Sequence, residues 1–347
     1  MTTFDPATGL ATGTFGFGTF QHGDDAPFPA LVLPGGTVGD LSDLYPDTLA
    51  IFEDWDRAFD QMARRADEPA GQRYSFETVK ALPVVARPNL LCTGANYRTH
   101  VAEMMTHNDM YRHLRKPGES DESFFSRNLA AVDRRAREGM PFIWVGLHSA
   151  LAGANDDIPL PVVGGQADWE LELGIYVKKP GRNLSLDEAD DLIAAYVMVN
   201  DLGLADTARR TDVQFEWDFL GKSSPGFFPC GPFAVPKEFV DLAQARIQLS
   251  VNGTRRQDWP VDDMIFGPKQ LLTYASERVG LRSGDLLIAG SPPGNAASHG
   301  RIWLSEGDVI ESEITYLGRQ RNEVVKEASN GRKPVFGPTI TTGSYGV

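Results

Sequence analysis

The chain has 347 residues, of which 41% are hydrophobic and 23% charged, a composition typical of a soluble globular protein. Its formal net charge of −14 argues against a nucleic-acid or anionic-membrane surface, which would need clustered lysine and arginine. No apolar run approaches the roughly 20 residues that span a bilayer, and the first residues lack the features of a signal peptide. Cys92 and Cys230 lie in apolar sequence and are expected to be buried free thiols. These features predict a cytoplasmic protein.

Residues 1–87 are expected to form a small N-terminal α+β domain. Short runs interrupted by glycine, such as GTFGFGTF, are typical of strands and turns. The segment TLAIFEDWDRAFDQMARRA, residues 48–66, favours a helix. A short buried strand, residues 89–92, is expected to follow.

Residues 97–139 are strongly charged and mostly helical in pattern, with a break at Pro117 and Gly118. Such a segment favours a helical hairpin or a lid. We expect Asn96 to cap its first helix, on which His100 and Glu103 share a face because they are three residues apart. Glutamate can orient an imidazole and raise its basicity, so that histidine removes a proton from water. On spacing alone, an ordinary surface pair stays open as the alternative.

The stretch DWELELGIYV, residues 168–177, alternates like a strand with three acids on one parity and apolar residues on the other. Glu170 and Glu172 can converge on one cation, whereas Asp168 is expected to be a strand-entry residue. Ser185 and Glu188 form a predicted capping box before a helix, and the next strand ends at Asp201. Asp201 supplies a third carboxylate if the two strands are neighbours. Three oxygen ligands suit Mg²⁺, Mn²⁺ or Ca²⁺; a solvent-exposed polar face is the alternative.

The last third predicts a hairpin turning at Asn252 and Gly253, a helix from residue 268, and a buried strand ending in the loop GSPPGN. Two more strands are expected within residues 306–325, and residues 331–347 are expected to form an extended arm. Lys222 is the only basic residue in LGKSSPGFFPCGP, so it either reaches out from the surface or meets an anion.

Seven blocks occur in an order that resembles the fumarylacetoacetate hydrolase superfamily over about residues 88–325: GANYRTHVAEM, DWELELGIYV, VNDLGLAD, LGKSS, DMIF, GDLLIAGSPPG and LSEGDVIESEI. The resemblance implies a β-rich α/β fold, a mixed β-sandwich roll at residues 88–330 with a helical lid insertion at about 97–139. It also implies a homodimer.

By the same resemblance, the metal ligands would be Glu170, Glu172 and Asp201, and the catalytic residues His100, Glu103 and Lys222. Substrate contacts would come from Tyr97, Gly290 and Ser291, with Ser291 replacing the usual threonine of a Gly-Thr-Pro loop.

Two positions depart from the family pattern. Relatives usually carry arginine and glutamine where this chain has Ala205 and Ala208, which removes a bidentate carboxylate clamp. Arg209 or Arg210 could compensate, and the sequence leaves this open. We therefore expect a less acidic or differently placed substrate tail.

The leading hypothesis is a Mg²⁺-dependent (or Mn²⁺- or Ca²⁺-dependent) hydrolase that cleaves a carbon–carbon bond of a 1,3-diketo compound, such as an acylpyruvate. The substrate would be a small keto acid or diketone, and the resemblance suggests catabolism of aromatic compounds. One alternative is an oxaloacetate-type decarboxylase or 2-oxo-enoate hydratase or isomerase using the same metal site. Another is a metal-stabilised binding protein that has lost catalysis.

Overall fold

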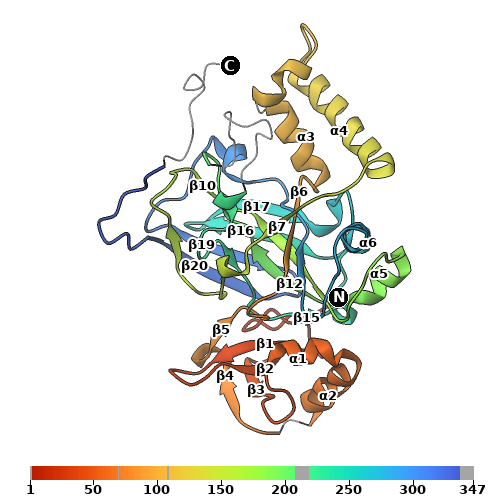
Figure 1. The fold of residues 1–347 in the computed structure, drawn as a ribbon, viewed down its shortest axis with the longest axis vertical. Helices are drawn as coiled ribbons and strands as arrows, with labels where there is room; N and C mark the ends of the chain where they lie inside the picture. Colours follow the sequence, from red (N-terminus) through yellow and green to blue (C-terminus); the bar gives the residue numbers. More distant parts are fainter. Residues whose placement is uncertain (1, 69, 108, 208–218, 337–347) are drawn as a thin grey trace.

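The computed structural model describes residues 2–68, 70–107, 109–207 and 219–336. An N-terminal sheet with two helices lies at one end of the molecule, a larger body of strands forms the middle, and helices α3 and α4 project from the opposite end (Figure 1). None of the helices in these ranges combines the length and the apolar character needed to cross a membrane.

The N-terminal sheet is antiparallel, with strand order β4-β3-β2-β1-β5. Its strands are β1 Gly16–Gln21, β2 Phe28–Leu33, β3 Thr37–Asp40, β4 Arg73–Ser75 and β5 Lys80–Leu82. The predicted helix is present as two helices, α1 Thr48–Glu53 and α2 Trp55–Asp67, which separate at Asp54. Asp47 caps α1, because its carboxylate accepts a hydrogen bond of 2.9 Å from the N–H of Ala50.

A mixed six-stranded sheet forms the centre of the molecule, in the order β15-β12-β11-β18-β6-β7. Its strands are β6 Leu90–Gly94, β7 Phe142–Gly146, β11 Leu171–Val177, β12 Ile193–Asn200, β15 Val235–Pro236 and β18 Leu286–Ile288. Only β18 and β6 run parallel; the other neighbours are antiparallel. The strands expected at residues 89–92 and before Asp201 are therefore confirmed.

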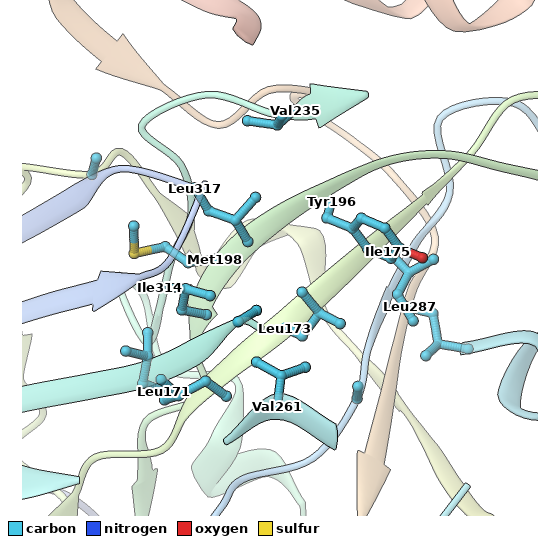
Figure 2. Close-up of a cluster of buried hydrophobic side chains, with 14 of the residues drawn as sticks. Leu171, Leu173, Ile175, Tyr196, Met198, Val235, Val261, Leu287, Ile314 and Leu317 are labelled. Atoms are coloured by element: carbon cyan, nitrogen blue, oxygen red, sulfur yellow. The ribbon is translucent and has the colours of Figure 1, made fainter. Parts of the chain in front are cut away.

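A second sheet of five strands packs on one face of this sheet, in the order β17-β16-β19-β20-β9. Its strands are β9 Ile158–Leu160, β16 Arg246–Val251, β17 Thr254–Pro260, β19 Val309–Ile314 and β20 Arg319–Lys326. The apolar side of β11, including Leu171 and Leu173, meets Ile314 of the second sheet in one buried cluster (Figure 2). The predicted hairpin is confirmed, since Asn252 and Gly253 both have positive φ angles at its turn.

The other face of the six-stranded sheet is covered by the N-terminal helices. Tyr176 of β11 packs against Phe52 of α1 with ring centroids 5.0 Å apart, and both belong to a cluster that also contains Trp55 of α2. All seven residues of β11 are therefore buried. The alternative of an exposed polar face is wrong for Glu172, which is only 1% exposed.

The charged segment after β6 forms two helices, α3 Arg98–His107 and α4 Asp121–Glu138, separated at the predicted Pro-Gly break. The guanidinium of Arg98 donates two hydrogen bonds to Asp133, which ties α3 to α4. The other helices are α5 Leu186–Leu192 and α6 Pro268–Ser276. The capping box of Ser185 and Glu188 is confirmed at the start of α5.

The expectation that Asn96 caps α3 is wrong. Its side-chain amide instead donates to the carbonyls of Phe266 and Ala289, at 2.9 and 2.8 Å. The N–H of Thr99 in the first turn donates to the carboxylate of Asp263, 3.2 Å away. A distant acid thus caps this helix, because the local asparagine is used to hold two other segments together.

Four two-residue strands complete the fold: β8 Leu151–Ala152, β10 Ala167–Asp168, β13 Gly203–Leu204 and β14 Phe228–Pro229. After β20 the described residues contain no helix or strand up to residue 336. Most of the predicted C-terminal arm, residues 337–347, lies outside the described residues.

Candidate active site

The predicted carboxylates meet where β11 and β12 lie side by side. These strands are antiparallel with Leu171 opposite Asn200, so Glu170 and Glu172 flank the end of the strand that leads into Asp201. The N–H of Asp201 donates to the carbonyl of Glu170 at 2.8 Å. One carboxylate oxygen from each of the three acids lies within 4.8 Å of the others. The pairing of two strands thus explains how acids thirty residues apart come together.

Lys222, in the short helix η4 Leu220–Lys222, places its ammonium among these acids. It donates hydrogen bonds to the carboxylate of Glu170 and, at 3.0 Å, to the carbonyl of Asp201. Its Nζ also lies 3.3 Å from Asp201 Oδ1. The sequence left open whether Lys222 reaches out from the surface or meets an anion. In the structure it meets anions, and these are the carboxylates of Glu170 and Asp201.

Burial and mutual repulsion make the charged acids costly. Burial, followed by the charges of Asp201 and Glu170, raises the pKa of Glu172 well above its ordinary value. Burial also raises the pKa of Asp201 to about 7, although Lys222 opposes this. Burial alone would lower the pKa of Lys222, but the carboxylates of Asp201 and Glu170 outweigh it and raise the value. One ammonium is therefore shared among three carboxylates.

These residues fit a hard divalent cation. All the donors are carboxylate oxygens, which suit Mg²⁺, Mn²⁺ or Ca²⁺ better than zinc. Asp201 Oδ1 is buried, and the Lys222 ammonium 3.3 Å away is the positive group that the described residues place beside it, without a well-formed hydrogen bond. A divalent cation would supply the positive charge that Lys222 alone does not.

Asp168 does not belong to this cluster. Its carboxylate accepts hydrogen bonds from the N–H groups of Trp169, at 2.8 Å, and Ala296, at 2.7 Å. The second bond ties β10 to the short helix η7, Ala296–His299. Asp168 therefore fixes a neighbouring loop, in keeping with its expected place at the entry of the strand.

His100 and Glu103 both lie on α3 but are not joined. Within the described ranges, no hydrogen bond or ion pair connects them. His100 Nδ1 is buried without a hydrogen-bond partner, and burial lowers the pKa of the imidazole, on which the charges of Glu170 and Lys222 also act. Glu103 instead lines an open hollow together with His107 and Asp121. The catalytic dyad stays a prediction.

The three predicted substrate contacts are all buried. Tyr97 is fully buried, and its hydroxyl has no hydrogen-bond partner in the described part of the chain. The N–H of Gly290 donates to Glu172 Oε2 at 2.5 Å. The hydroxyl of Ser291 accepts from Gln257 and donates to the carbonyl of Pro292, both at 3.1 Å. In this arrangement Gly290 and Ser291 contact the protein's own groups.

Sequence patterns did not reveal two buried amides beside the carboxylates. Asn200 Oδ1 accepts from the N–H of Glu170 at 2.9 Å, and Gln257 Oε1 accepts from the N–H of Leu171 at 3.0 Å. Asn200 adjoins Asp201 in the sequence and could have been noticed for that reason. Gln257 lies in a hairpin strand with no local signal of its role.

Of the two positions that depart from the family pattern, the structure describes Ala205 but not Ala208. Ala205 is exposed, and its N–H donates to the carbonyl of Gln166 at 2.9 Å. Ala208, Arg209 and Arg210 lie outside the described residues. Whether either arginine replaces the missing clamp stays an open prediction.

Comparison with known families decides the family of this chain. Residues 89–325 match the family model described as the C-terminal domain of fumarylacetoacetate (FAA) hydrolase. The chain belongs to the fumarylacetoacetate hydrolase family. The resemblance seen in the sequence is thereby confirmed, and the sheet-rich α/β fold agrees with that of solved members.

Among curated relatives of this fumarylacetoacetate hydrolase family member is a 2,4-didehydro-3-deoxy-L-rhamnonate hydrolase of Sphingomonas sp. It is 38% identical over 187 residues, covering 53% of this chain and 65% of the relative. A mitochondrial oxaloacetate tautomerase of Xenopus laevis is 27% identical over 310 residues, covering 87% of this chain and 88% of the relative. The family thus includes hydrolases and tautomerases.

Solved structures with the same fold include maleylpyruvate hydrolase from Sphingobium sp. in complex with manganese(II) and pyruvate. Its TM-score is 0.67 at 19% identity, covering 90% of this chain and 99% of that one. Fumarylacetoacetate hydrolase from Exiguobacterium antarcticum has a TM-score of 0.69 at 23% identity, covering 90% and 100%.

Proposed function

We propose that this protein is a divalent-metal-dependent hydrolase that cleaves the carbon–carbon bond of a 2,4-dioxo acid, such as an acylpyruvate. One observation carries the proposal: three carboxylates converge, two of them buried, and the charge of Glu170 acts on His100, whose buried Nδ1 has no hydrogen-bond partner among the described residues. The 38% identical relative is named as a hydrolase of a 2,4-didehydro-3-deoxy sugar acid, which is a compound of this class.

Glu170, Glu172 and Asp201 would hold the metal ion. When bound, such an ion polarises substrate oxygens and stabilises negative charge that develops on them. Mn²⁺ or Mg²⁺ is expected; the maleylpyruvate hydrolase with the same fold is described in complex with manganese(II).

The residues of the chain would carry the proton transfers. Burial lowers the pKa of His100 and so disfavours its charged form, and the neutral imidazole would accept a proton from water at Nδ1. The water oxygen then attacks the carbonyl farther from the carboxylate, and the carbon–carbon bond breaks. The released carbon accepts a proton, which yields a carboxylic acid and pyruvate. Lys222 and the buried Tyr97 hydroxyl, which has no hydrogen-bond partner among the described residues, would donate to the negative charge that develops on the substrate.

A second candidate is an oxaloacetate tautomerase, and one geometric observation favours it. Glu103 does not contact His100, so the arrangement expected for activating water is incomplete. Tautomerisation moves a proton between carbon and oxygen and requires no attacking water. The Xenopus relative with this activity in its name aligns over most of both chains.

Isotopically labelled water separates the candidates. The full-length protein is incubated with Mn²⁺ and either an acylpyruvate or enol-oxaloacetate, and the enol absorbance is followed. Hydrolysis releases a carboxylic acid that carries labelled oxygen in its new carboxyl group, whereas tautomerisation releases no acid. Turnover of oxaloacetate alone would favour the second candidate, and turnover of neither substrate would favour the binding protein without catalysis.

Substitution of His100 tests its role. We expect His100→Ala to lower kcat by about 100-fold or more, the range typical of general bases. The control is His22→Ala, at a side chain of the N-terminal region that is 45% exposed, which should leave kcat within about twofold. Equal rates for wild type and His100→Ala would refute the assignment.

A homodimer is part of the same proposal. The edge strand β7 exposes Phe142 and Val145, which are 46% and 67% exposed, and Leu147 beside them is 46% exposed. Apolar side chains along an unpaired strand edge favour pairing with another chain. Light scattering after size-exclusion chromatography should give twice the mass of one chain.

A further inference from the structure

Gln257 connects the carboxylate strand to the loop that carries Ser291. It lies on β17 of the five-stranded sheet and is fully buried. Its Oε1 accepts from the N–H of Leu171 at 3.0 Å, and its Nε2 donates to Ser291 Oγ at 3.1 Å and to the carbonyl of Pro292 at 3.2 Å. One side chain of the second sheet therefore contacts both parts of the candidate site.

The strand side of this connection lies between two of the carboxylates. Leu171 separates Glu170 from Glu172, and the N–H of Glu170 is held by Asn200 at 2.9 Å. Two successive backbone N–H groups of the ligand segment are thus held by side-chain oxygens. Holding the backbone here fixes the directions from which both glutamates approach the site.

The loop side lies against β17 and against Glu172. The N–H of Gly290 donates to Glu172 Oε2 at 2.5 Å. Gly294 lies so close to β17 that a Cβ atom at this position would come within 2.1 Å of the carbonyl oxygen of Arg256. The loop therefore packs closely against β17, and Gln257 spans from β17 to both the loop and the carboxylate strand, which Gly290 also joins directly.

The amide chemistry of Gln257 also determines the direction of the Ser291 hydroxyl. Because Nε2 donates to Ser291 Oγ, the hydroxyl proton must point away from Gln257. A glutamate at this position would accept from that hydroxyl instead and would add a negative charge beside three carboxylates. A methionine would make none of the three hydrogen bonds.

We propose that Gln257 is a positioning residue, which holds the Glu170–Glu172 segment and the Gly290–Ser291 loop in register so that metal and substrate oxygens are bound together. This role rests on the proposed metal site. Partners that orient metal ligands commonly contribute about 10- to 100-fold to metal affinity.

The test compares Gln257→Met and Gln257→Glu with matched substitutions of Gln320. Gln320 is also buried, at 2% exposed, and its Nε2 donates to the carbonyls of Pro229 and Gly231 at 3.3 and 2.9 Å. It contacts none of the three carboxylates or the Ser291 loop. Free Mn²⁺ is measured by electron paramagnetic resonance, and oxalate binding to the Mn²⁺-loaded protein by calorimetry, so that no turnover is needed.

We expect Gln257→Met to weaken Mn²⁺ binding by about tenfold or more. Gln257→Glu keeps the acceptor for Leu171 but reverses the contact with Ser291, so oxalate affinity should fall by about tenfold even where Mn²⁺ still binds. Both Gln320 variants should bind both ligands within about twofold of wild type.

Wild-type affinities for Mn²⁺ and oxalate in both Gln257 variants would overturn the proposal, as would equal losses in the Gln320 variants. If Gln257→Met does not fold, the oxalate affinity of Gln257→Glu decides alone. A wild type that binds no Mn²⁺ would refute the metal site itself, and this role of Gln257 with it.

Discussion

Gly290 donates its backbone N–H to Glu172 Oε2 over 2.5 Å, so the loop after β18 contacts a candidate metal ligand directly. Gly290 has a φ of +93°, a backbone conformation that side chains with a Cβ rarely adopt. The close approach and the positive φ have the same origin, because the loop must turn sharply to bring its N–H to the carboxylate.

Substitution of Gly290 by alanine should therefore be destabilising. A Cβ atom there would lie 2.9 Å from Asn96 Cβ and 3.1 Å from the carbonyl oxygen of Thr93. We expect Gly290→Ala to lower the free energy of unfolding by about 2 kcal/mol, measured by urea denaturation. Gly280→Ala is the matched control, since no atom lies within 4 Å of its Cβ position. Equal effects of the two substitutions would contradict the argument.

Removing Lys222 should expose the repulsion among the carboxylates. We expect Lys222→Met to lower the free energy of unfolding of the metal-free protein by about 3 kcal/mol, because buried acids lose their counter-charge. Excess Mg²⁺ or Mn²⁺ should restore part of this loss. Lys179→Met, at a lysine whose side chain is 54% exposed, should change stability by less than about 0.5 kcal/mol. A loss that no divalent cation reduces would argue against a metal site at this position.

Glu172→Gln should separate metal binding from stability. In wild type, metal at about 100 times its dissociation constant should raise the free energy of unfolding by about 2.7 kcal/mol. The variant should gain no such increase, while its metal-free stability should equal or exceed that of wild type, because burial disfavours the charged glutamate. Thermal melting with and without Mn²⁺ measures both. Glu311→Gln, at an exposed glutamate of β19, should respond to the metal as wild type does.

Asp285 provides a test of pH dependence away from the carboxylate cluster. Burial raises its pKa above the ordinary 3.8, although Arg282 and Asn89 donate hydrogen bonds to it. A raised pKa in the folded protein contributes stability that is complete below pH 3.8 and is lost as the pH rises through the folded value.

The free energy of unfolding of wild type, relative to that of Asp285→Asn, should therefore fall as the pH rises from 3.8 through the raised pKa of Asp285 in the folded protein. Urea denaturation at several pH values measures the difference. A difference that stays constant or grows with pH would contradict the raised pKa.

Local sequence patterns predicted those parts of the molecule that neighbouring residues determine. Ser185 and Glu188 form the expected capping box, and Asn252 and Gly253 form the expected turn. The convergence of Glu170, Glu172 and Asp201 was predictable because it needs only alternation within one strand and the pairing of two strands.

Contacts between distant segments were not predictable in the same way. Asn96 precedes a helix as a cap would, yet its amide is taken by Phe266 and Ala289 far along the chain. Glu103 has the right spacing to orient His100, but it lines the hollow between α3 and α4. Gln257 shows no local signal, because its importance depends on two segments that only the tertiary fold brings to it.

The six-stranded sheet is covered by the five-stranded sheet on one face and by the N-terminal helices on the other. This arrangement limits which segments can be removed from the chain or exchanged with those of a relative. Tyr176 lies on the same strand as Glu172, and its ring rests on Phe52 of the N-terminal helices. A truncated protein starting at β6 would leave this aromatic surface bare, and the carboxylate strand would lose the support behind it. A transplanted N-terminal region would work only if its side chains matched Tyr176 and its neighbours, so the two halves of the chain must change together.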